Sequence, residues 1–406
     1  MTSESTDQPI FTREALEDPY ALYARLRAQS PVLHDPHTGM WILTGYDAVY
    51  GALRDHETFA SSGAYGRRGG DGEGDGERSG GGGGGGLSMV LINDDPPRHT
   101  RFRQLVNKVF TPRRIAELEP WIGGVVDELL DAATEDEAGD VDIVDAFTVP
   151  LPVTVIATLL GIPTSERERF KRWSSALLSG TRGTSDERMS QVGEMIQFLN
   201  GAIAEKRAQP ADDLITALGA AEVDGEKLAD WEVLGFCVLL LVAGNETTTN
   251  LLGNMLDVLV ERPELWAALR DDRDLVEPVI EETLRYDSPV QMLFRSTTRE
   301  TELEGVTIPE HAPLLVSFAA ANRDPAGFDH PDEFRLDREL TKHIGFGMGI
   351  HYCLGSPLAR AEARIGLNAL LDRYETIERG AGPGVRQTSS QLVRGFERLP
   401  LRLNRG

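Results

Sequence analysis

The pattern of apolar and polar positions predicts a chain made mainly of helices. Amphipathic runs begin with DPYALYARLRAQ and continue through residues 117–230, where Pro150, Pro152, Pro163 and Pro210 divide successive helices with acidic surfaces. The alternating segment MWILTGY predicts a short strand in a small sheet near the N-terminus. We therefore expect a mainly α fold with small β-sheets.

One predicted helix is longer than a typical globular helix. It covers EVLGFCVLLLVAGNETTTNLLGNMLDVLVERP and ends at Pro263. Its apolar run from Phe236 to Ala243 is too short to span a bilayer, so we expect a helix through the centre of the protein. The residues from Gly244 to Thr249 are poor helix formers placed where burial should be greatest, and such a local conflict usually marks function.

Two interpretations of this central segment remain open. A threonine hydroxyl that bonds to a carbonyl one turn earlier can loosen the helix and open a groove, and the adjacent carboxylate of Glu246 can then relay protons. Alternatively, the threonines cap a helix that restarts at Asn250. Cys237, on the apolar run, is expected to be a small buried hydrophobe.

A glycine-rich segment interrupts the first third of the chain. From Gly69 to Gly86 the sequence reads GGDGEGDGERSGGGGGGG, which cannot bury enough apolar area to offset its backbone entropy. Because candidate residues lie on both sides of it, we expect a flexible loop within one domain rather than a linker. A polar tail is expected at residues 1–12.

Composition narrows the class of protein. With 406 residues the chain has room for two or three average domains or one large one, and a formal net charge of -24 argues against nucleic acid as a partner. Two cysteines, Cys237 and Cys353, exclude a disulfide framework and fit a reducing compartment. The N-terminal sequence has neither a basic nor an apolar leader region, so a cytoplasmic protein is expected.

Cys353 lies in the unusual stretch HIGFGMGIHYCLGS. The glycines at 345, 347 and 349 let the backbone approach something flat and bulky, and Gly355 allows a tight turn after the cysteine. Pro357 then begins a helix, whose N-terminal amides and dipole favour a thiolate at Cys353.

Such a thiolate is either a nucleophile or a metal ligand. A zinc site needs further Cys or His ligands, and only His351 is near in sequence. A nucleophile needs a general base and an oxyanion hole, and neither is evident. A haem iron needs one protein ligand, so the single cysteine points to haem.

The stretch FGMGIHYCLG, Phe346 to Gly355, resembles the haem-binding loop of the cytochrome P450 family. Three further segments follow the order found in that family. AGNETT, from Ala243 to Thr248, is similar to its oxygen-activating helix, ETLR at Glu282 to Arg285 to its E-x-x-R pair, and FRLDR at Phe334 to Arg338 to the segment with the third member of its Glu-Arg-Arg core. DPPRHTRFR, PADDLITAL and AANRDP resemble soluble bacterial members, and the resemblance extends from Asp18 to Leu403 apart from the glycine-rich segment.

This resemblance implies one large helical prism with a small β portion over residues 1–406, enclosing haem b. It implies Cys353 as the axial thiolate and metal ligand, with Phe346 packed against the sulfur, and Glu246 and Thr247 as the catalytic acid–alcohol pair that delivers protons during oxygen activation. Further haem contacts implied are His99, Arg103, Ala243, Gly244, Arg295, Gly347, His351 and Gly355. Glu282, Arg285 and Arg338 are expected to form a buried structural ion network.

The resemblance also implies where substrate would bind. The implied walls of the substrate site are Leu87, Met89, Val90, Leu240, Ala243, Val290, Met292, Leu293 and Phe396. Nearly all are apolar, so we expect a hydrophobic small molecule. The glycine-rich segment lies where the family has a substrate-covering loop, and a mobile lid and an inert insertion remain equal alternatives.

The implied activity is a monooxygenase that inserts one atom of dioxygen into the substrate, by hydroxylation or epoxidation. Electrons would come singly from a ferredoxin or flavodoxin, and thus indirectly from NAD(P)H. The segment from Pro96 to Ala116 contains no acidic residue, and we expect an acidic partner to dock on this sulfur-side face. The docking residues would be Arg98, Arg101, Lys108, Arg113, Arg114, Arg360 and Arg364.

Two alternative functions remain open, a peroxide-driven haem enzyme and a non-catalytic haem protein that binds or senses ligands. The first usually accompanies loss of the acid–alcohol pair, which is intact here. A Thr247→Ala variant discriminates, because a monooxygenase should keep consuming reductant but lose coupling to product, whereas a binder has no turnover to lose.

Overall fold

The computed structural model describes residues 10–63, 90–108, 110–133, 140–166, 168–170, 172–173, 185–223, 225–339 and 342–405. The expected flexible loop at 69–86, most of the polar tail at 1–12, and the predicted substrate contacts Leu87 and Met89 lie outside the described residues.

Helices dominate the described chain, as the sequence predicts. The α-helices are α1 (Arg13–Glu17), α2 (Pro19–Gln29), α3 (Tyr46–Arg54), α4 (Arg98–Asn107), α5 (Pro112–Ala132), α6 (Pro150–Leu159), α8 (Ser185–Ala208), α9 (Leu214–Ala220), α10 (Asp230–Val260), α11 (Pro263–Asp271), α12 (Val276–Tyr286), α13 (Phe318–Asn322) and α14 (Ser356–Arg373). Short π and 3-10 turns are η1 (Val144–Thr148), η2 (Thr164–Glu166), η3 (Arg273–Leu275) and η4 (Gly349–His351). Pro150 stands in the first turn of α6, where its missing N–H costs nothing.

The strands form one five-stranded sheet and several smaller ones. The large sheet has the order β1 (Val32–Asp35), β2 (Met40–Leu43), β10 (Pro313–Ser317), β7 (Met292–Thr297), β3 (Phe59–Ala60). A second sheet has the order β11 (Thr376–Arg379), β14 (Pro400–Asn404), β4 (Asp140–Asp142). The remaining pairs are β5 (Glu222–Val223) with β6 (Glu226–Lys227), β8 (Thr301–Leu303) with β9 (Val306–Ile308), and β12 (Val385–Arg386) with β13 (Phe396–Arg398). The predicted strand MWILTGY corresponds to β2, which pairs with the distant β10 as well as with β1.

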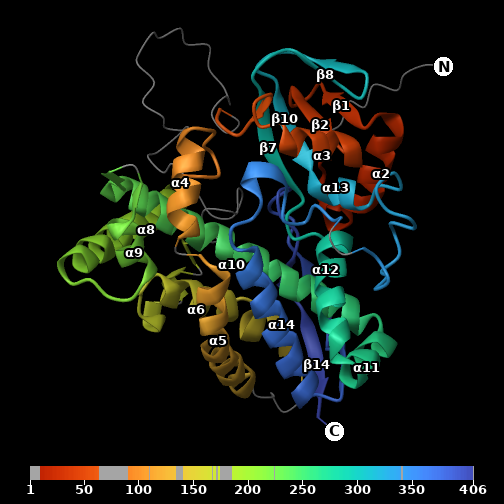
Figure 1. Ribbon diagram of the computed structural model, residues 1–406. Helices are drawn as coiled ribbons and strands as arrows, with labels where there is room; N and C mark the ends of the chain where they lie inside the picture. The colour runs from red at the N-terminus through yellow and green to blue at the C-terminus, as the bar shows by residue number, and fades with distance from the viewer. Residues whose placement is uncertain are drawn as a thin grey trace.

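Helix α10 runs through the middle of the molecule, and α14 passes beside it with α5 and α6 nearby (Figure 1). It is 31 residues long, and its apolar residues belong to the main hydrophobic core. The helix is continuous across the glycine and threonine segment. The alternative in which the threonines cap a helix that restarts at Asn250 is therefore wrong.

Within the described residues, no helix combines the length and the apolar composition needed to cross a bilayer. The sheet of β1, β2, β10, β7 and β3 lies with α2, α3 and α13 at one end of the molecule (Figure 1). The loop that carries Cys353 connects η4 to α14, so it lies between this end and the helical core.

Candidate active site

The loop before Cys353 folds back on itself. The N–H of Gly347 donates to the carbonyl oxygen of Ile344 at 2.8 Å, and the N–H of Cys353 donates to the carbonyl oxygen of Phe346 at 2.9 Å. These bonds fix the cysteine at the entrance to α14.

The glycines of this loop serve the protein's own packing. A Cβ at position 345 would lie 2.9 Å from the carbonyl oxygen of Leu284, and one at position 349 would lie 2.5 Å from that of Leu53. Gly347 has a φ of 71°, in the left-handed region. Gly345 and Gly349 are thus needed for the protein's own packing, and the prediction that the loop also admits a flat ligand stays a prediction. Gly355 has a φ of -82°, which other residues also adopt, so its turn does not require glycine.

Opposing influences act on the Cys353 thiol. Burial raises its pKa, while the N–H groups of Gly355 and Ser356 and the guanidinium groups of Arg103 and Arg360 lower it. Burial is the largest of these, so the helix N-terminus alone does not produce the predicted thiolate. A bound metal cation would deprotonate the thiol.

The described residues contain no cluster of three or more His, Cys, Asp or Glu side chains that could hold a metal ion. A zinc site of the usual composition is therefore absent from that part of the chain. Cys353 has a free thiol that is partly accessible. A single thiol ligand suits a metal whose other ligands come from a macrocycle, as those of iron do in haem.

Four predicted haem contacts come together beside this loop. The rings of His99 in α4 and His351 in η4 have centroids 4.4 Å apart. The charges of Arg295 and Arg103 both act on His351, and the Ser61 hydroxyl lies 3.0 Å from its Nε2. Burial, reinforced by these charges, lowers the pKa of His99 to about 4 and that of His351 to about 3. Burial and the arginines thus favour the neutral form of both rings, and the arginines supply the positive charge of the cluster.

The Nε2 atom of His99 is buried and has no hydrogen-bond partner among the described residues. A buried ring nitrogen that lacks a partner, in a cluster that also holds Arg103 and Arg295, can donate a hydrogen bond to an anion when its tautomer carries the proton there. The carboxylates of the haem propionates would supply such an anion. The cluster of His99, Arg103, Arg295 and His351 therefore suits haem.

On α10, the segment from Ala243 to Thr247 differs from the rest of the helix. Ala243 is exposed and Gly244 partly so, although the turns before and after are buried, so this side faces an internal space. The Thr247 hydroxyl donates to the carbonyl oxygen of Ala243 at 2.7 Å, as the first interpretation of this segment requires. A Cβ at Gly244 would lie 2.9 Å from the Cδ1 atom of Ile156 in α6, so a larger residue here would require the Ile156 side chain to move.

Glu246 is largely buried beside Thr247. Burial raises the pKa of its carboxyl group, and a hydrogen bond from Gln387 Nε2 to Glu246 Oε1 at 2.9 Å opposes that rise. Sequence reasoning missed Gln387, since no motif surrounds it and 141 residues separate it from Glu246.

Glu282, Arg285 and Arg338 form a buried ion network. Arg285 donates to both carboxylate oxygens of Glu282, at 2.8 and 2.7 Å, and Arg338 Nε donates to Oε1 at 3.0 Å. Arg285 also donates to the carbonyl oxygens of Asn322, Pro331 and Glu333. The network thereby ties α12 to the segment that precedes the Cys353 loop.

A second ion cluster lies on the other side of this loop. Glu281 accepts hydrogen bonds from Arg360 at 2.6 and 2.8 Å and lies 2.8 Å from His343 Nε2, and these partners outweigh burial to lower its pKa to about 2. The Arg360 guanidinium lies 4.5 Å from the centre of the Phe346 ring. These side chains line a hollow of about 370 Å³ that also includes Tyr352.

The predicted substrate contacts do not all share one environment. Met292 and Leu293 are neighbours in β7, so their side chains point to opposite faces of the sheet. Met292 packs in a cluster with Tyr23 and Ile42, whereas Leu293 lies on the face that Arg295 shares. The expectation that both line one cavity is therefore wrong for Met292.

Among the other predicted contacts, Val90 and Leu240 are buried in the main core, and Val290 packs at the edge of a second cluster. The Phe396 ring lies 3.7 Å below the Arg386 guanidinium and next to Gly253 of α10. These contacts give the Phe396 ring a packing role.

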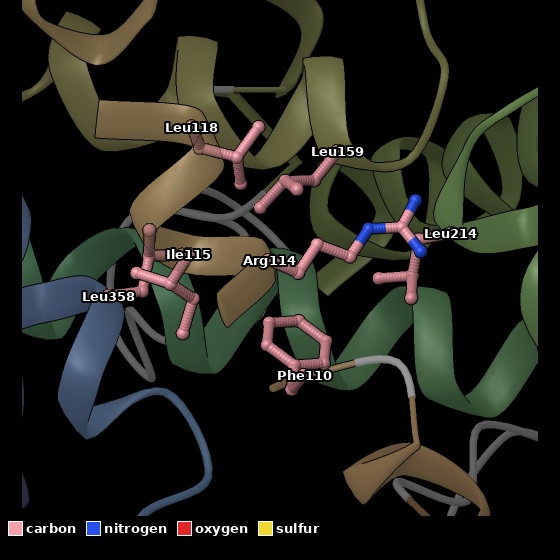
Figure 2. A pocket seen from close by; sticks show the side chains of 7 residues that line it. All are labelled: Phe110, Arg114, Ile115, Leu118, Leu159, Leu214 and Leu358. Carbon is pink, nitrogen blue, oxygen red and sulfur yellow. The ribbon is translucent and has the colours of Figure 1, made fainter. Parts of the chain in front are cut away.

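A separate small pocket lies between α5, α6, α9 and α14, with the aliphatic part of Arg114 along one side (Figure 2). It is lined by Phe110, Arg114, Ile115, Leu118, Leu159, Leu214 and Leu358. Its volume of about 20 Å³ corresponds to one water molecule, and its walls are mostly apolar, so it offers no room for a substrate.

Comparisons with known proteins agree with this geometry. The sequence model of the family described as Cytochrome P450 matches residues 32–395. Cytochrome P450 107B1 of Saccharopolyspora erythraea is 40% identical over 409 residues, covering 99% of both chains. The 6-deoxyerythronolide B hydroxylase of the same organism is 35% identical over 392 residues, covering 95% of this chain and 96% of its own.

Among solved structures, CYP109E1 from Bacillus megaterium in complex with testosterone superimposes with a TM-score of 0.86 at 36% identity, covering 97% of this chain and 100% of that one. The chain thus matches one family in both sequence and fold. The same chain has the Cys353 loop, the continuous helix α10 and the cluster of His99, Arg103, Arg295 and His351. The chain belongs to the cytochrome P450 family, and it is a monooxygenase that uses haem b, dioxygen, an organic substrate and electrons from NAD(P)H by way of a redox partner.

Proposed function

We propose that Cys353 would supply the protein ligand of the haem iron and that Ala243 and Gly244 of α10 would contact the haem. The observation that carries this proposal is the buried Nε2 of His99, which has no hydrogen-bond partner among the described residues and lies in a cluster with Arg103, Arg295 and His351, beside the loop that carries the partly accessible Cys353 thiol. The cluster would bind the two propionates, with the histidines donating N–H groups and the arginines supplying charge. Phe346 and Gly347 would pack against the sulfur side of the ring.

When bound, the haem supplies reductive activation of dioxygen, so that one oxygen atom enters the substrate and the other leaves as water with two electrons and two protons. The chain's part in this step is to deliver protons. Because the hydrogen of the Thr247 hydroxyl is donated to Ala243, its oxygen is left to accept a hydrogen bond in the internal space. Burial raises the pKa of the Glu246 carboxyl group, which helps it to take up and pass on a proton.

Thr247→Ala tests this assignment. The variant should consume reductant at a rate within a few fold of the wild type but form much less product and release peroxide instead. A matched Thr248→Ala change, on the buried neighbouring position, should leave the ratio of product to reductant nearly unchanged. Equal ratios in wild type and the Thr247→Ala variant would remove Thr247 from proton delivery.

We propose further that the substrate is a bulky apolar molecule of the steroid or macrolide-aglycone type. Ala243, which is exposed on α10, and Leu293, on the face of β7 that Arg295 shares, would offer apolar walls with few hydrogen-bonding groups. The similarity to a 6-deoxyerythronolide B hydroxylase and to a structure holding testosterone supports the same size class. Titration of the holoenzyme with testosterone and with 6-deoxyerythronolide B, followed by the Soret spin-state change, tests it; micromolar binding of either supports this class, and a response only to small polar molecules contradicts it.

The electron donor is proposed to be an acidic ferredoxin or flavodoxin that docks on the sulfur side. Among the predicted docking residues, Arg113 is highly exposed, with 89% of its side chain accessible, and its partner Glu117 is also exposed. Arg360 and Arg364 line the hollow beside the Cys353 loop. Since exposed ion pairs are weak, an incoming carboxylate can exchange with Glu117 at little cost.

Three broader expectations also stay proposals. We propose that residues 1–406 form one catalytic domain, that the protein acts in the cytoplasm, and that the glycine-rich segment at 69–86 has a role in substrate entry. Deleting that segment and measuring testosterone affinity and turnover tests the last of these; unchanged values would favour an inert insertion.

A further inference from the structure

Gln387, to which no role has been assigned, contacts the proposed catalytic acid. Among the described residues it is the one side chain that hydrogen-bonds the Glu246 carboxylate, with Nε2 2.9 Å from Oε1. It follows directly after β12 in the C-terminal part of the chain, whereas Glu246 lies in the middle of α10. A contact between such distant segments depends on how the β12–β13 pair is fixed on the helix.

One end of the β12–β13 pair is fixed by Arg386. Its Nη1 donates to Asn254 Oδ1 at 2.7 Å, and its Nη2 donates to Asp257 Oδ2 at 2.7 Å. Arg386 also stacks on Phe396, at 3.7 Å from the ring centre, so the two strands and α10 are joined at this point. These partners are largely buried, which makes the contact insensitive to salt.

Close packing fixes the same end of the pair, at the position next to Arg386 and Phe396. A Cβ at Gly395 would lie 1.8 Å from Oδ1 of Asn250, so only glycine fits there. The N–H of Gln387 donates to the carbonyl oxygen of Gly395 at 3.1 Å, which places Gln387 directly opposite this glycine. Glu246 lies one turn before Asn250 on α10, and hence within reach of the Gln387 side chain.

The contact residues on α10 are spaced four, four and three apart, so they share one face of the helix. They are Glu246, Asn250, Asn254 and Asp257. This register determines which side chain of the hairpin meets Glu246. The amide also lies 3.3 Å from the Ser389 hydroxyl, so Gln387 keeps a second acceptor when the carboxylate gains a proton.

We propose that Gln387 is a positioning residue that orients the Glu246 carboxylate for proton delivery, and that the β12–β13 hairpin sets its place through its register on α10. The inference rests on the proposed role of Glu246. A hydrogen bond to one carboxylate oxygen leaves the other free to exchange protons. The amide therefore limits the carboxylate to one rotamer without blocking its chemistry.

The test uses the haem-loaded full chain, a surrogate ferredoxin and reductase, and testosterone as the probe substrate. Gln387→Leu should lower the product formed per NADPH by about three- to tenfold and raise peroxide release. Gln387→Asn, which is too short to reach Oε1, should behave similarly and serves if the leucine variant does not fold. Gln391→Leu is the matched control in the same segment and should stay within about twofold of the wild type.

A second readout needs no turnover. In the resting holoenzyme, at a pH where titration shows Glu246 to be partly ionised, loss of the amide should increase the infrared band of protonated carboxyl groups, because the hydrogen bond favours the charged form of Glu246. The increase should vanish in the Glu246→Gln/Gln387→Leu double variant, which assigns the band to Glu246.

The outcomes of these tests distinguish a failure of the proposed role of Glu246 from a failure of the inference about Gln387. If Glu246→Gln itself leaves coupling unchanged, the proposed role of Glu246 fails. If Glu246→Gln lowers coupling but Gln387→Leu and Gln387→Asn match the Gln391→Leu control in coupling and in the infrared spectrum, Glu246 keeps its role and the inference about Gln387 is overturned.

Discussion

At Cys353, burial and positive charge act in opposite directions on the same thiol. The neutral thiol is favoured by burial, and the nearby amides and arginines reduce the cost of the thiolate. Such a site is suited to binding a metal cation through the thiolate, which a purely apolar pocket is not. At His99, the buried Nε2 atom has no hydrogen-bond partner among the described residues, and a bound anion would supply one.

Glu362 in α14 is a second buried acid, and it gives a prediction at this scale. It is almost fully buried, its Oε2 has no partner among the described residues, and burial raises its pKa from 4.5 to about 8. Because the folded state keeps the proton, its contribution is complete below pH 4.5 and is lost as pH rises from 4.5 to 8.

Glu362→Gln should therefore become more stable relative to the wild type as pH rises, by more than about 1 kcal/mol between pH 5 and pH 8. Urea unfolding of the holoenzyme at several pH values measures this slope. Glu264→Gln, at an exposed position of α11, is the control. A stability difference that does not change with pH would show that Glu362 ionises in the folded protein much as it does in the unfolded chain.

At the scale of elements, the ion network of Glu282, Arg285 and Arg338 connects α12 to the segment before the cysteine loop. Arg285 alone makes five side-chain hydrogen bonds, two to Glu282 and three to carbonyl oxygens. Lysine cannot reproduce this planar set of donors.

Arg285→Lys should cost about 3 kcal/mol or more of unfolding free energy and lower haem retention, because it leaves buried acceptors without donors. Thermal unfolding with measurement of bound haem checks this. Arg335→Lys alters an ion pair with the exposed Asp337 and should cost less than about 1 kcal/mol. Equal costs for the two variants would mean that the buried network is not what holds the loop.

Elements that are marked by a contiguous sequence motif were predictable from the sequence. The Cys353 loop and the acid–alcohol segment are contiguous motifs, so their residues could be named and the central helix located. The strand alternation at Met292 and Leu293 was available in the sequence but was not applied, which led to the error at Met292. Gln387 could not be predicted, because its contact depends on the register of a distant hairpin on α10.

At the scale of the whole molecule, acidic and basic residues are unevenly distributed along the chain. The chain carries a net charge of -24, yet the segment from Pro96 to Ala116 lacks acidic residues. In the fold, its basic side chains pair with acids from elsewhere, as Arg101 does with Glu226 and Arg114 with Asp212. The predicted basic face is therefore a mixed surface, on which Arg113 is a highly accessible cation.

Arg113→Glu should slow reduction by an acidic ferredoxin severalfold at low salt, and the difference from wild type should shrink as ionic strength rises. Stopped-flow reduction measures this. Arg13→Glu is a matched control, since Arg13 also forms an exposed i, i+4 pair, with Glu17, but on α1. Identical slowing by both variants would indicate a general charge effect in place of a docking site.

The absorption spectrum of the dithionite-reduced protein with carbon monoxide tests the central claim most directly. Thiolate ligation by Cys353 predicts a strongly red-shifted Soret band, which Cys353→His should replace with the band typical of histidine-ligated haem. A wild-type spectrum that already shows the histidine-type band would contradict thiolate ligation, and the absence of a Soret band in the wild-type protein would contradict the haem site itself.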